Sequence, residues 1–289
     1  MWTTENRHRY NRDRLRYPSD LTDAEWQLIE PFIPPARRGG GKRRVVIREV
    51  VNGVMYVLST GCQWRSIPKD LPPRSTVNGY FCHWSWDGTL ERIHDALYVK
   101  CREQAGREIT PTACVIDSQS VKSAEKGVCI DPPGFDAGKL IKGKKRHLLV
   151  DTLGLVLHAL VTGAGVQDRD GGVLLLRTLF GQFPFLRKLF ADQAYAGPIF
   201  HAGAAAAMPS LAVAIVKRSK QAKGFVVEPK RWIVERTIAW LNRCRRLARD
   251  WKTAITARLR SSVLPPSASC SESSVIPYEV LGRTLKLGF

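Results

Sequence analysis

Residues 147–162 read HLLVDTLGLVLHALVT, and they consist of two apolar runs separated by a short turn. The runs 147–151 and 155–162 have the length and the aliphatic content of β-strands. Leu153 and Gly154 lie between the runs, and a glycine at such a point is typical of a tight reversal. The segment therefore predicts two successive strands of a sheet.

The sequence on both sides of this segment extends the sheet. One short apolar run ends at Asp117, another ends at Asp192, and Asp170-Gly171-Gly172 opens a helix between them. In chain order, we predict strands at 113–116, 147–151 and 155–162, a helix at 170–180, a strand at 188–191, a helix at 198–208, a strand at 211–216 and a helix at 229–251. A three-stranded meander followed by crossover helices predicts an α/β fold, a mixed sheet flanked by helices in the ribonuclease H-like order.

The sequence before residue 110 has the apolar spacing of helices instead. Thr22-Asp23-Ala24-Glu25 is a capping box that opens a first helix, and Pro34-Pro35 ends it. Later helices are predicted at 48–59 with Gly61 as the stop, at 75–86 with Ser75 as the cap, and at 90–104. This pattern predicts an all-helical, helix-turn-helix-like domain whose third helix, preceded by Arg74, enters a DNA groove. A helical dimerisation or packing domain is the alternative.

The net charge of the chain indicates an anionic partner. There are 45 Lys and Arg against 26 Asp and Glu, which gives a formal charge of +19. Such a surplus attracts polyanions, with nucleic acid as the first candidate and an anionic membrane as the second. Asp151 and His158 interrupt the most apolar segment, and the Arg-rich N-terminus lacks the apolar core of a signal peptide. We therefore expect a cytoplasmic or nucleoid-associated protein with no membrane partner.

The cysteines indicate neither a disulfide framework nor a zinc site. Their number, seven, is odd, and no two of them are spaced as CxxC. Cys82-His83 with His94 and Cys101 match no usual zinc-finger spacing. Plain buried thiols are the favoured interpretation.

Three acidic residues stand where the predicted fold can bring them together. Asp117 and Asp192 end apolar strands, and ligand sites of open α/β sheets lie at strand ends. If these strands are neighbours, the two carboxylates repel each other unless a cation lies between them, and a divalent metal supplies it. Glu235, on the last helix, is the third candidate ligand. We predict that Asp117, Asp192 and Glu235 hold two Mg²⁺ ions and are catalytic, with a structural ion pair as the alternative for Glu235.

Basic residues lie on both sides of these acids in the sequence. Arg231 shares a helix face with Glu235, and further arginines form a basic edge beside it. The predicted DNA-binding residues are Arg231, Arg236, Arg243, Arg246, Lys122, Lys144, Lys145, Arg146 and Arg74. For the four residues between 122 and 146, a solvated loop is the alternative interpretation.

Other acids have simpler predicted roles. Asp168 and Asp170 precede a helix and are expected to be N-caps. Asp151 ends a strand beside the Leu153-Gly154 turn and is expected to stabilise that turn.

Six motifs in order resemble one family. They are LTDAEWQLIEPFIP, TGCQWRSIPKDLPPRSTVNGYFCHWSWDGTLERIHDAL, VIDSQSVKSAEKG, GFDAGKLIKGKKRHLLVDTLGLVLHALVTGA, ADQAYAG and PKRWIVERTIAWLNRCRRLARDW. Together they resemble the DDE transposases of bacterial insertion sequences, in the insertion-sequence-five family, over about residues 17–255. The resemblance implies Mg²⁺ or Mn²⁺, and transposition by cutting and rejoining DNA at terminal inverted repeats that the helical part recognises. The family's catalytic triad falls on Asp117, Asp192 and Glu235, and its arginine before the glutamate falls on Arg231.

The chain departs from this family in three places. Glu228 stands where the superfamily has a tyrosine, and Asn242 stands where it has a basic residue. From about residue 258 the sequence becomes Ser- and Pro-rich, where relatives continue with an apolar helix. We predict a basic flexible arm at 1–19, a helical DNA-binding domain at 20–110, a ribonuclease H-like catalytic domain at 111–257 and an atypical disordered tail at 258–289.

The expected function is that of a DNA transposase. Its partners would be double-stranded DNA, as inverted repeats and as target, and a homodimer or higher assembly in the synaptic complex. Two alternatives remain open from the sequence. One is a plain nuclease of the same fold, and the other is a catalytically impaired or decayed copy that only binds DNA.

Overall fold

The computed structural model describes residues 4, 11–36, 39, 42–124, 133–179, 181–216 and 230–250. The predicted tail at 258–289, Glu228 and most of the first ten residues lie outside these ranges. The chain divides into two compact units. Of the described residues, the first unit contains those up to 101 and 243–247, and the second contains 102–242 and 248–250.

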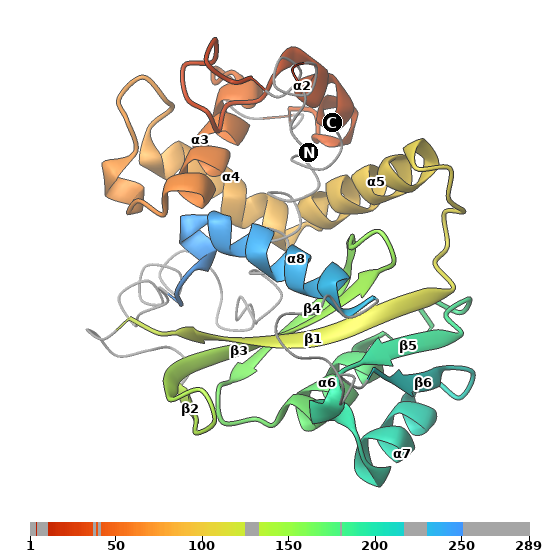
Figure 1. Ribbon diagram of the computed structural model, residues 1–289. Coiled ribbons are helices and arrows are strands. Elements are labelled where there is room, and N and C mark those ends of the chain that lie inside the picture. The colour runs from red at the N-terminus through yellow and green to blue at the C-terminus, as the bar shows by residue number, and fades with distance from the viewer. Residues whose placement is uncertain are drawn as a thin grey trace. The chain divides into compact units, whose positions relative to one another are not determined.

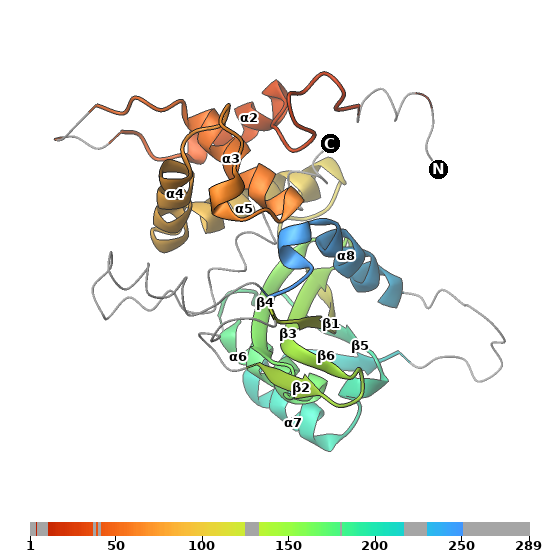
Figure 2. The ribbon, with the colours of Figure 1, turned by 90° about the vertical axis from the view of Figure 1, so that its left-hand side faces the viewer.

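The first unit is helical, as the sequence predicted. Its helices are α2 (Asp23–Ile29), α3 (Ile47–Thr60), α4 (Arg74–Trp86) and most of α5 (Thr89–Gln104), with the short 3₁₀ turns η1 (Glu30–Phe32), η2 (Trp64–Ser66) and η4 (Arg245–Leu247) (Figure 2). The α3 and α4 helices approach closely at Gly53, where an added Cβ would lie 2.9 Å from a methyl of Val77. Val77 and the apolar side of α3 are buried there. An apolar helical core therefore stabilises this unit.

The helix ends of this unit follow from local sequence, with one exception. Thr22 and Glu25 form the predicted capping box. Gly61 ends α3 in the left-handed conformation, with φ of 68°. The prediction that Ser75 caps the third helix is wrong, because Pro73 is the N-cap and α4 already begins at Arg74. A proline fixes φ near the helical value and needs no amide donor, so it fits a helix start.

Residues 11–19 of the predicted flexible arm are held by ion pairs. Arg12 donates to Glu25, at 2.7 Å from Oε2. Arg16 contacts Glu49 at 2.6 Å and Asp20 at 3.1 Å. Arginines of the predicted flexible arm thus pair with carboxylates of the helical unit. This part of the chain is therefore not a flexible arm.

The second unit contains a curled mixed sheet. Its strands are β1 (Ala113–Lys122), β2 (Gly134–Asp136), β3 (Ile141–Asp151), β4 (Val156–Gly163), β5 (Lys188–Ala191) and β6 (Ala212–Ile215). The path through the sheet is β2-β3-β1-β5-β6, and β4 also pairs with β3. The β1 strand runs antiparallel to β3 and parallel to β5. The first and fourth predicted strands are therefore neighbours, which is the condition for bringing Asp117 and Asp192 together.

The polar connection predicted at 122–145 is largely strand where the structure describes it. Residues 134–136 form β2, and β3 begins at Ile141, six residues earlier than predicted. A search for apolar alternation misses this part of β3, because the charge of the buried Lys145 is satisfied by the carboxylates of Asp136 and Asp168 rather than by water.

Helices cover both faces of this sheet. The α6 (Asp168–Thr178) and α7 (Pro198–Ala207) helices lie on one face, and α8 (Arg231–Arg243) lies on the other (Figure 1). This arrangement confirms the predicted α/β, ribonuclease H-like class. None of the described helices is both long and apolar enough to cross a membrane.

Candidate active site

Asp117 and Asp192 are held at adjacent positions of the sheet. The β1 and β5 strands pair in parallel, with Val115 opposite Phe190, so the two aspartates follow at equal distances. The Ser118 amide donates to Asp117 Oδ1 at 2.7 Å. Asp192 caps the 3₁₀ turn η3 (Gln193–Tyr195) by accepting from the Ala194 amide at 2.9 Å. Backbone donors therefore fix the direction of both carboxylates.

Asp117 and Asp192 interact electrostatically. Burial raises the pKa of Asp117 to about 6, and the hydrogen bond from the Ser118 amide opposes this shift. The negative charge of Asp192 adds to the rise, and the charges of Arg231 and Lys139 oppose it more weakly. Repulsion between two neighbouring carboxylates favours a bound cation.

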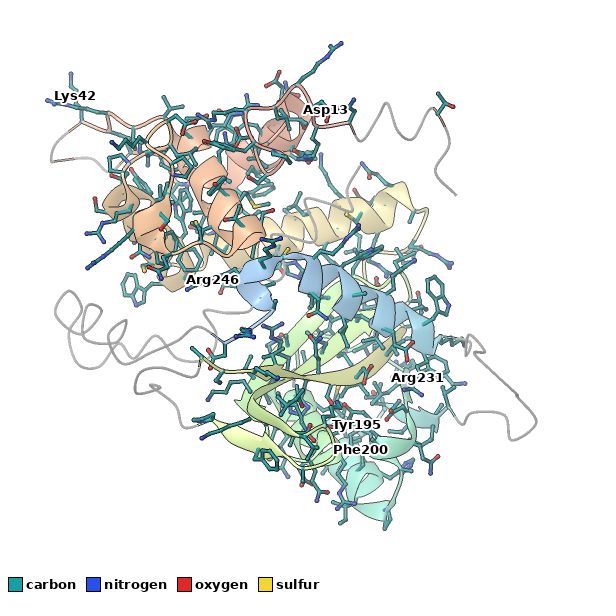
Figure 3. The ribbon with its side chains drawn as sticks, turned by 60° about the vertical axis from the view of Figure 1, so that its left-hand side comes forward. Asp13, Lys42, Tyr195, Phe200, Arg231 and Arg246 are labelled. Atoms are coloured by element: carbon teal, nitrogen blue, oxygen red, sulfur yellow. The ribbon has the colours of Figure 1, made fainter. Side chains whose placement is uncertain are left out.

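The Arg231 guanidinium links Glu235 to Asp192. The Arg231 side chain, at the start of α8, lies 3.0 Å from Glu235 Oε1 and 3.6 Å from Asp192 Oδ2 (Figure 3). Glu235 is half exposed. The ion pair that the sequence left open for Glu235 is therefore present, and its partner also contacts the second aspartate.

The carboxylates of these three residues are suitable ligands for magnesium or manganese, but the three side chains are not arranged as a complete metal site. Carboxylate oxygens are the ligands that Mg²⁺ prefers. Over the described ranges, however, no three His, Cys, Asp or Glu side chains are grouped closely enough to hold a metal. The Arg231 guanidinium lies between Glu235 and Asp192, and it supplies the positive charge that a metal would supply. Metal binding at this place needs that arginine to move.

Asp168 belongs to a buried network beside the site. Lys145 Nζ lies 2.8 Å from Asp168 and 3.4 Å from Asp136. The prediction that Asp168 or Asp170 caps the helix is wrong, because Gln167 is the N-cap of α6. Although burial opposes ionisation, the Lys145 ammonium holds the pKa of Asp168 below its usual value. Asp168 therefore serves as a counterion for a buried lysine.

This network changes the set of residues available to DNA. Lys144, Lys145 and Arg146 are at most 9% exposed. These three side chains are buried in β3, so they form neither a solvated loop nor an edge that phosphates can reach. Sequence position could not reveal this, because a basic run looks the same whether acids or water face it.

Arg236 is also engaged within the protein. Its guanidinium lies between the rings of Trp232 and Trp240, at 4.4 and 4.7 Å, and donates to the Leu153 carbonyl at 2.8 Å. Of the other predicted DNA contacts, Arg74, Lys122 and Arg243 are exposed, and Arg246 is half-buried.

Two residues near the acids were not predicted. Tyr195 is fully buried beside Phe200 (Figure 3), and burial together with the charges of Asp117, Asp168 and Asp192 raises the pKa of its phenol. Lys139 follows Asp136 in the turn between β2 and β3, and its charge lowers the pKa of Asp117. Tyr195 stands three residues after Asp192 in the ADQAYAG motif, which is the signal that could have identified it.

The described cysteines are free thiols, and two of them are buried as the sequence predicted. Cys114 and Cys244 are buried free thiols, and Cys62, Cys82 and Cys101 are partly buried. Burial raises the pKa of the Cys114 thiol above its usual range. Within the described ranges, no cysteine takes part in a metal-binding cluster.

Comparisons with known proteins agree with this fold. A family model described as "Transposase DDE domain" matches residues 109–262, more than half of the chain. A second, described as "Putative transposase of IS4/5 family", matches residues 21–94. The insertion element IS402 uncharacterized 16.2 kDa protein of Burkholderia cepacia is 30% identical over 113 residues, which cover 37% of this chain and 76% of that protein. No solved structure matches the chain. The chain therefore belongs to the DDE transposases of insertion sequences.

Proposed function

We propose that this transposase cleaves DNA at the terminal inverted repeats of its element and joins the ends to target DNA, with Asp117, Asp192 and Glu235 as its catalytic metal ligands. The observation that carries the proposal is the electrostatic repulsion between Asp117, in the middle of β1, and Asp192, directly after β5, with Glu235 linked to Asp192 through Arg231. The family generally uses divalent metal ions, and carboxylates are suitable ligands for them.

The residues of the site would divide the work as follows. Asp117, Asp192 and Glu235 would hold two Mg²⁺ or Mn²⁺ ions, which when bound would supply an activated water and stabilisation of the leaving oxygen. Asp117 and Asp192, oriented by backbone amides, define the sheet side of the metal site. Glu235 closes it from α8. Arg231, once released from its two carboxylates, is placed to meet a phosphate of the strand being cut.

The remaining basic residues support binding of the duplex. Arg74, exposed at the first turn of α4, is the proposed contact from the helical unit to the inverted repeat. Lys122, Arg243 and Arg246 are the proposed contacts to the DNA backbone. Joining two ends of one element needs both ends in one assembly, so we propose a homodimer or a higher assembly in the synaptic complex.

The proposal is tested by supplying the purified protein with duplexes that carry its element's own ends. Mg²⁺-dependent cleavage at the ends, followed by joining of pre-cut ends to a plasmid, supports a transposase. Cleavage without joining supports a plain nuclease of the same fold. Neither product in Mg²⁺ or Mn²⁺ would contradict the catalytic proposal.

A second candidate is a copy that binds DNA without catalysis. The absence, within the described ranges, of a ready-made cluster of three acids favours it. Under this alternative, the protein still binds the inverted repeats. Substitution of Asp117 then changes neither the DNA affinity nor any reaction product.

DNA binding is expected to weaken steeply with salt. A protein that contacts about 6–10 phosphates loses about 10³–10⁵ in affinity between 50 and 200 mM salt, because bound counterions are released on association. Fluorescence anisotropy with a labelled inverted repeat measures this slope. A flat response would contradict the assignment of the +19 charge to nucleic acid.

Metal affinity is expected to fall as the pH decreases through about 6. The pKa of Asp117 is raised to about 6, so below that pH a metal has to displace a proton from this carboxyl. Titration of Mn²⁺ at pH 5 and pH 7.5 by water-proton relaxation measures the difference. An unchanged affinity would mean that Asp117 is not a ligand, and Asp117→Asn should remove the dependence between these two pH values.

A further inference from the structure

We infer that Arg236 and Thr237 are positioning residues, which clamp the turn between β3 and β4 and thereby aim Glu235 at the metal site. This inference rests on the proposed function, because it assigns a task to the residues that follow a proposed metal ligand. It adds two residues that do not touch the metal or the DNA.

The clamp consists of hydrogen bonds from consecutive residues of α8 to consecutive carbonyls of one turn. Arg236 donates to the Leu153 carbonyl at 2.8 Å. The Thr237 hydroxyl lies 3.0 Å from the Gly154 carbonyl and 3.0 Å from the Ile233 carbonyl one turn earlier in its own helix. Thr237 is fully buried. The side chains directly after Glu235 are therefore fixed to the sheet.

The turn that α8 holds is rigid in its own right. The Asp151 carboxylate accepts from the amides of Leu153 at 2.9 Å and Leu155 at 2.8 Å. Gly154 has φ of 82°, a conformation that glycine adopts without strain. The Arg102 guanidinium pairs with the buried Asp151. The turn therefore serves as a fixed reference for the helix.

Arg236 is held in place from two sides. Trp232, Arg236 and Trp240 stand four residues apart on one side of α8, and the guanidinium lies between the two rings. Stacking restricts the rotamers of a long side chain, so less conformational entropy is lost when the hydrogen bond to Leu153 forms. The stacking and the hydrogen bond together fix how α8 is rotated about its own axis.

The rotation of α8 matters because Glu235 is otherwise weakly constrained. Its carboxylate is half exposed and pairs with Arg231, which is itself 37% exposed. Successive side chains of a helix are about 100° apart, so fixing residues 236 and 237 on the turn also sets the direction of residue 235. A metal site tolerates errors of only about 0.5 Å in its ligands. A loosened clamp therefore weakens metal binding before it unfolds the domain.

The test compares three threonine variants of the full chain. Thr237→Val removes the hydroxyl with little change of shape, and Thr237→Ser restores it. Thr178→Val is the control for the loss of a hydroxyl that donates within its own helix: the Thr178 hydroxyl donates to the Leu175 carbonyl in α6 at 2.7 Å, and α6 lies on the face of the sheet opposite to α8 (Figure 1). Mn²⁺ affinity without DNA is measured by water-proton relaxation, together with the Mn²⁺ concentration for half-maximal cleavage, DNA affinity and Tm.

We expect Thr237→Val to bind Mn²⁺ about 10-fold more weakly, which is the lower end of the loss seen for outer residues of metal sites. Thr237→Ser and Thr178→Val should bind as the wild type does, and DNA affinity should not change in any of the three. Arg236→Gln, at a partly exposed position, should show the same loss of Mn²⁺ affinity, which keeps the test valid if Thr237→Val does not fold.

The outcomes separate this inference from the proposed function. If Thr237→Val and Arg236→Gln lower Tm and bind Mn²⁺ normally, the clamp is only structural and the inference is wrong. If Arg236→Gln instead weakens DNA binding and leaves Mn²⁺ affinity intact, Arg236 is a DNA contact and the inference is again wrong. If Glu235→Gln itself leaves Mn²⁺ affinity and cleavage unchanged, the proposed function fails at its third ligand.

Discussion

Asp117→Asn is expected to reduce DNA cleavage by about 10³-fold or more, which corresponds to about 4 kcal/mol of transition-state stabilisation. Asparagine keeps the shape of the side chain and loses the negative charge that the metal needs. Asp192→Asn and Glu235→Gln should have effects of similar size, because removing one member of a catalytic unit costs about as much as removing the whole unit. Gel analysis of cleavage at the element's ends measures the loss.

The controls for this prediction separate catalysis from folding and from DNA binding. Burial raises the pKa of Asp117, so ionised Asp117 destabilises the metal-free folded state above pH 6, and its neutral replacement should not lower Tm. Affinity for the inverted repeat should stay within about threefold, since one carboxylate carries little of a contact dominated by phosphates. Asp170→Asn, at a half-exposed acid on α6, should cleave normally. Full activity of Asp117→Asn would end the catalytic assignment.

Asp151→Ala is expected to destabilise the second unit by about 3–5 kcal/mol, since it removes the buried carboxylate that pairs with the buried Arg102 guanidinium. The same change removes the acceptor for the amides of Leu153 and Leu155, which define the turn. With a total stability of only about 5–15 kcal/mol, such a loss leaves much of the protein unfolded at 37 °C.

Urea denaturation followed by circular dichroism measures this free energy of unfolding. Asp170→Ala is the matched control, because the Asp170 side chain is 53% exposed and its nearest cation, Arg169, is 3.9 Å away. Its effect should stay within about 0.5 kcal/mol. A loss below about 1 kcal/mol for Asp151→Ala would mean that the Arg102 charge finds solvent, contrary to its burial.

Local sequence predicted most elements, because their signals act over a few residues. The capping box at Thr22, the Gly61 stop and the strand at 188–191 are each determined by neighbours in the chain. The exceptions arise where a distant partner decides. The β3 strand begins at Ile141 because Lys145 meets Asp136 and Asp168 inside the unit, and a single sequence does not show which acid a lysine will meet.

The sequence by itself determined the fold class, the family and the two aspartates on neighbouring strands, because hydrophobic periodicity and short motifs encode local structure. The prediction that Asp117 ends its strand was wrong, because β1 continues to Lys122. It also identified Glu235 as an acid on the last helix. Only the tertiary structure decided what surrounds these acids: Arg231 between Glu235 and Asp192, Tyr195 buried beside them, and Arg236 held between two tryptophans. Those facts depend on distances between residues far apart in the chain. Charge pairing and burial are set by such distances, and composition and spacing do not contain them.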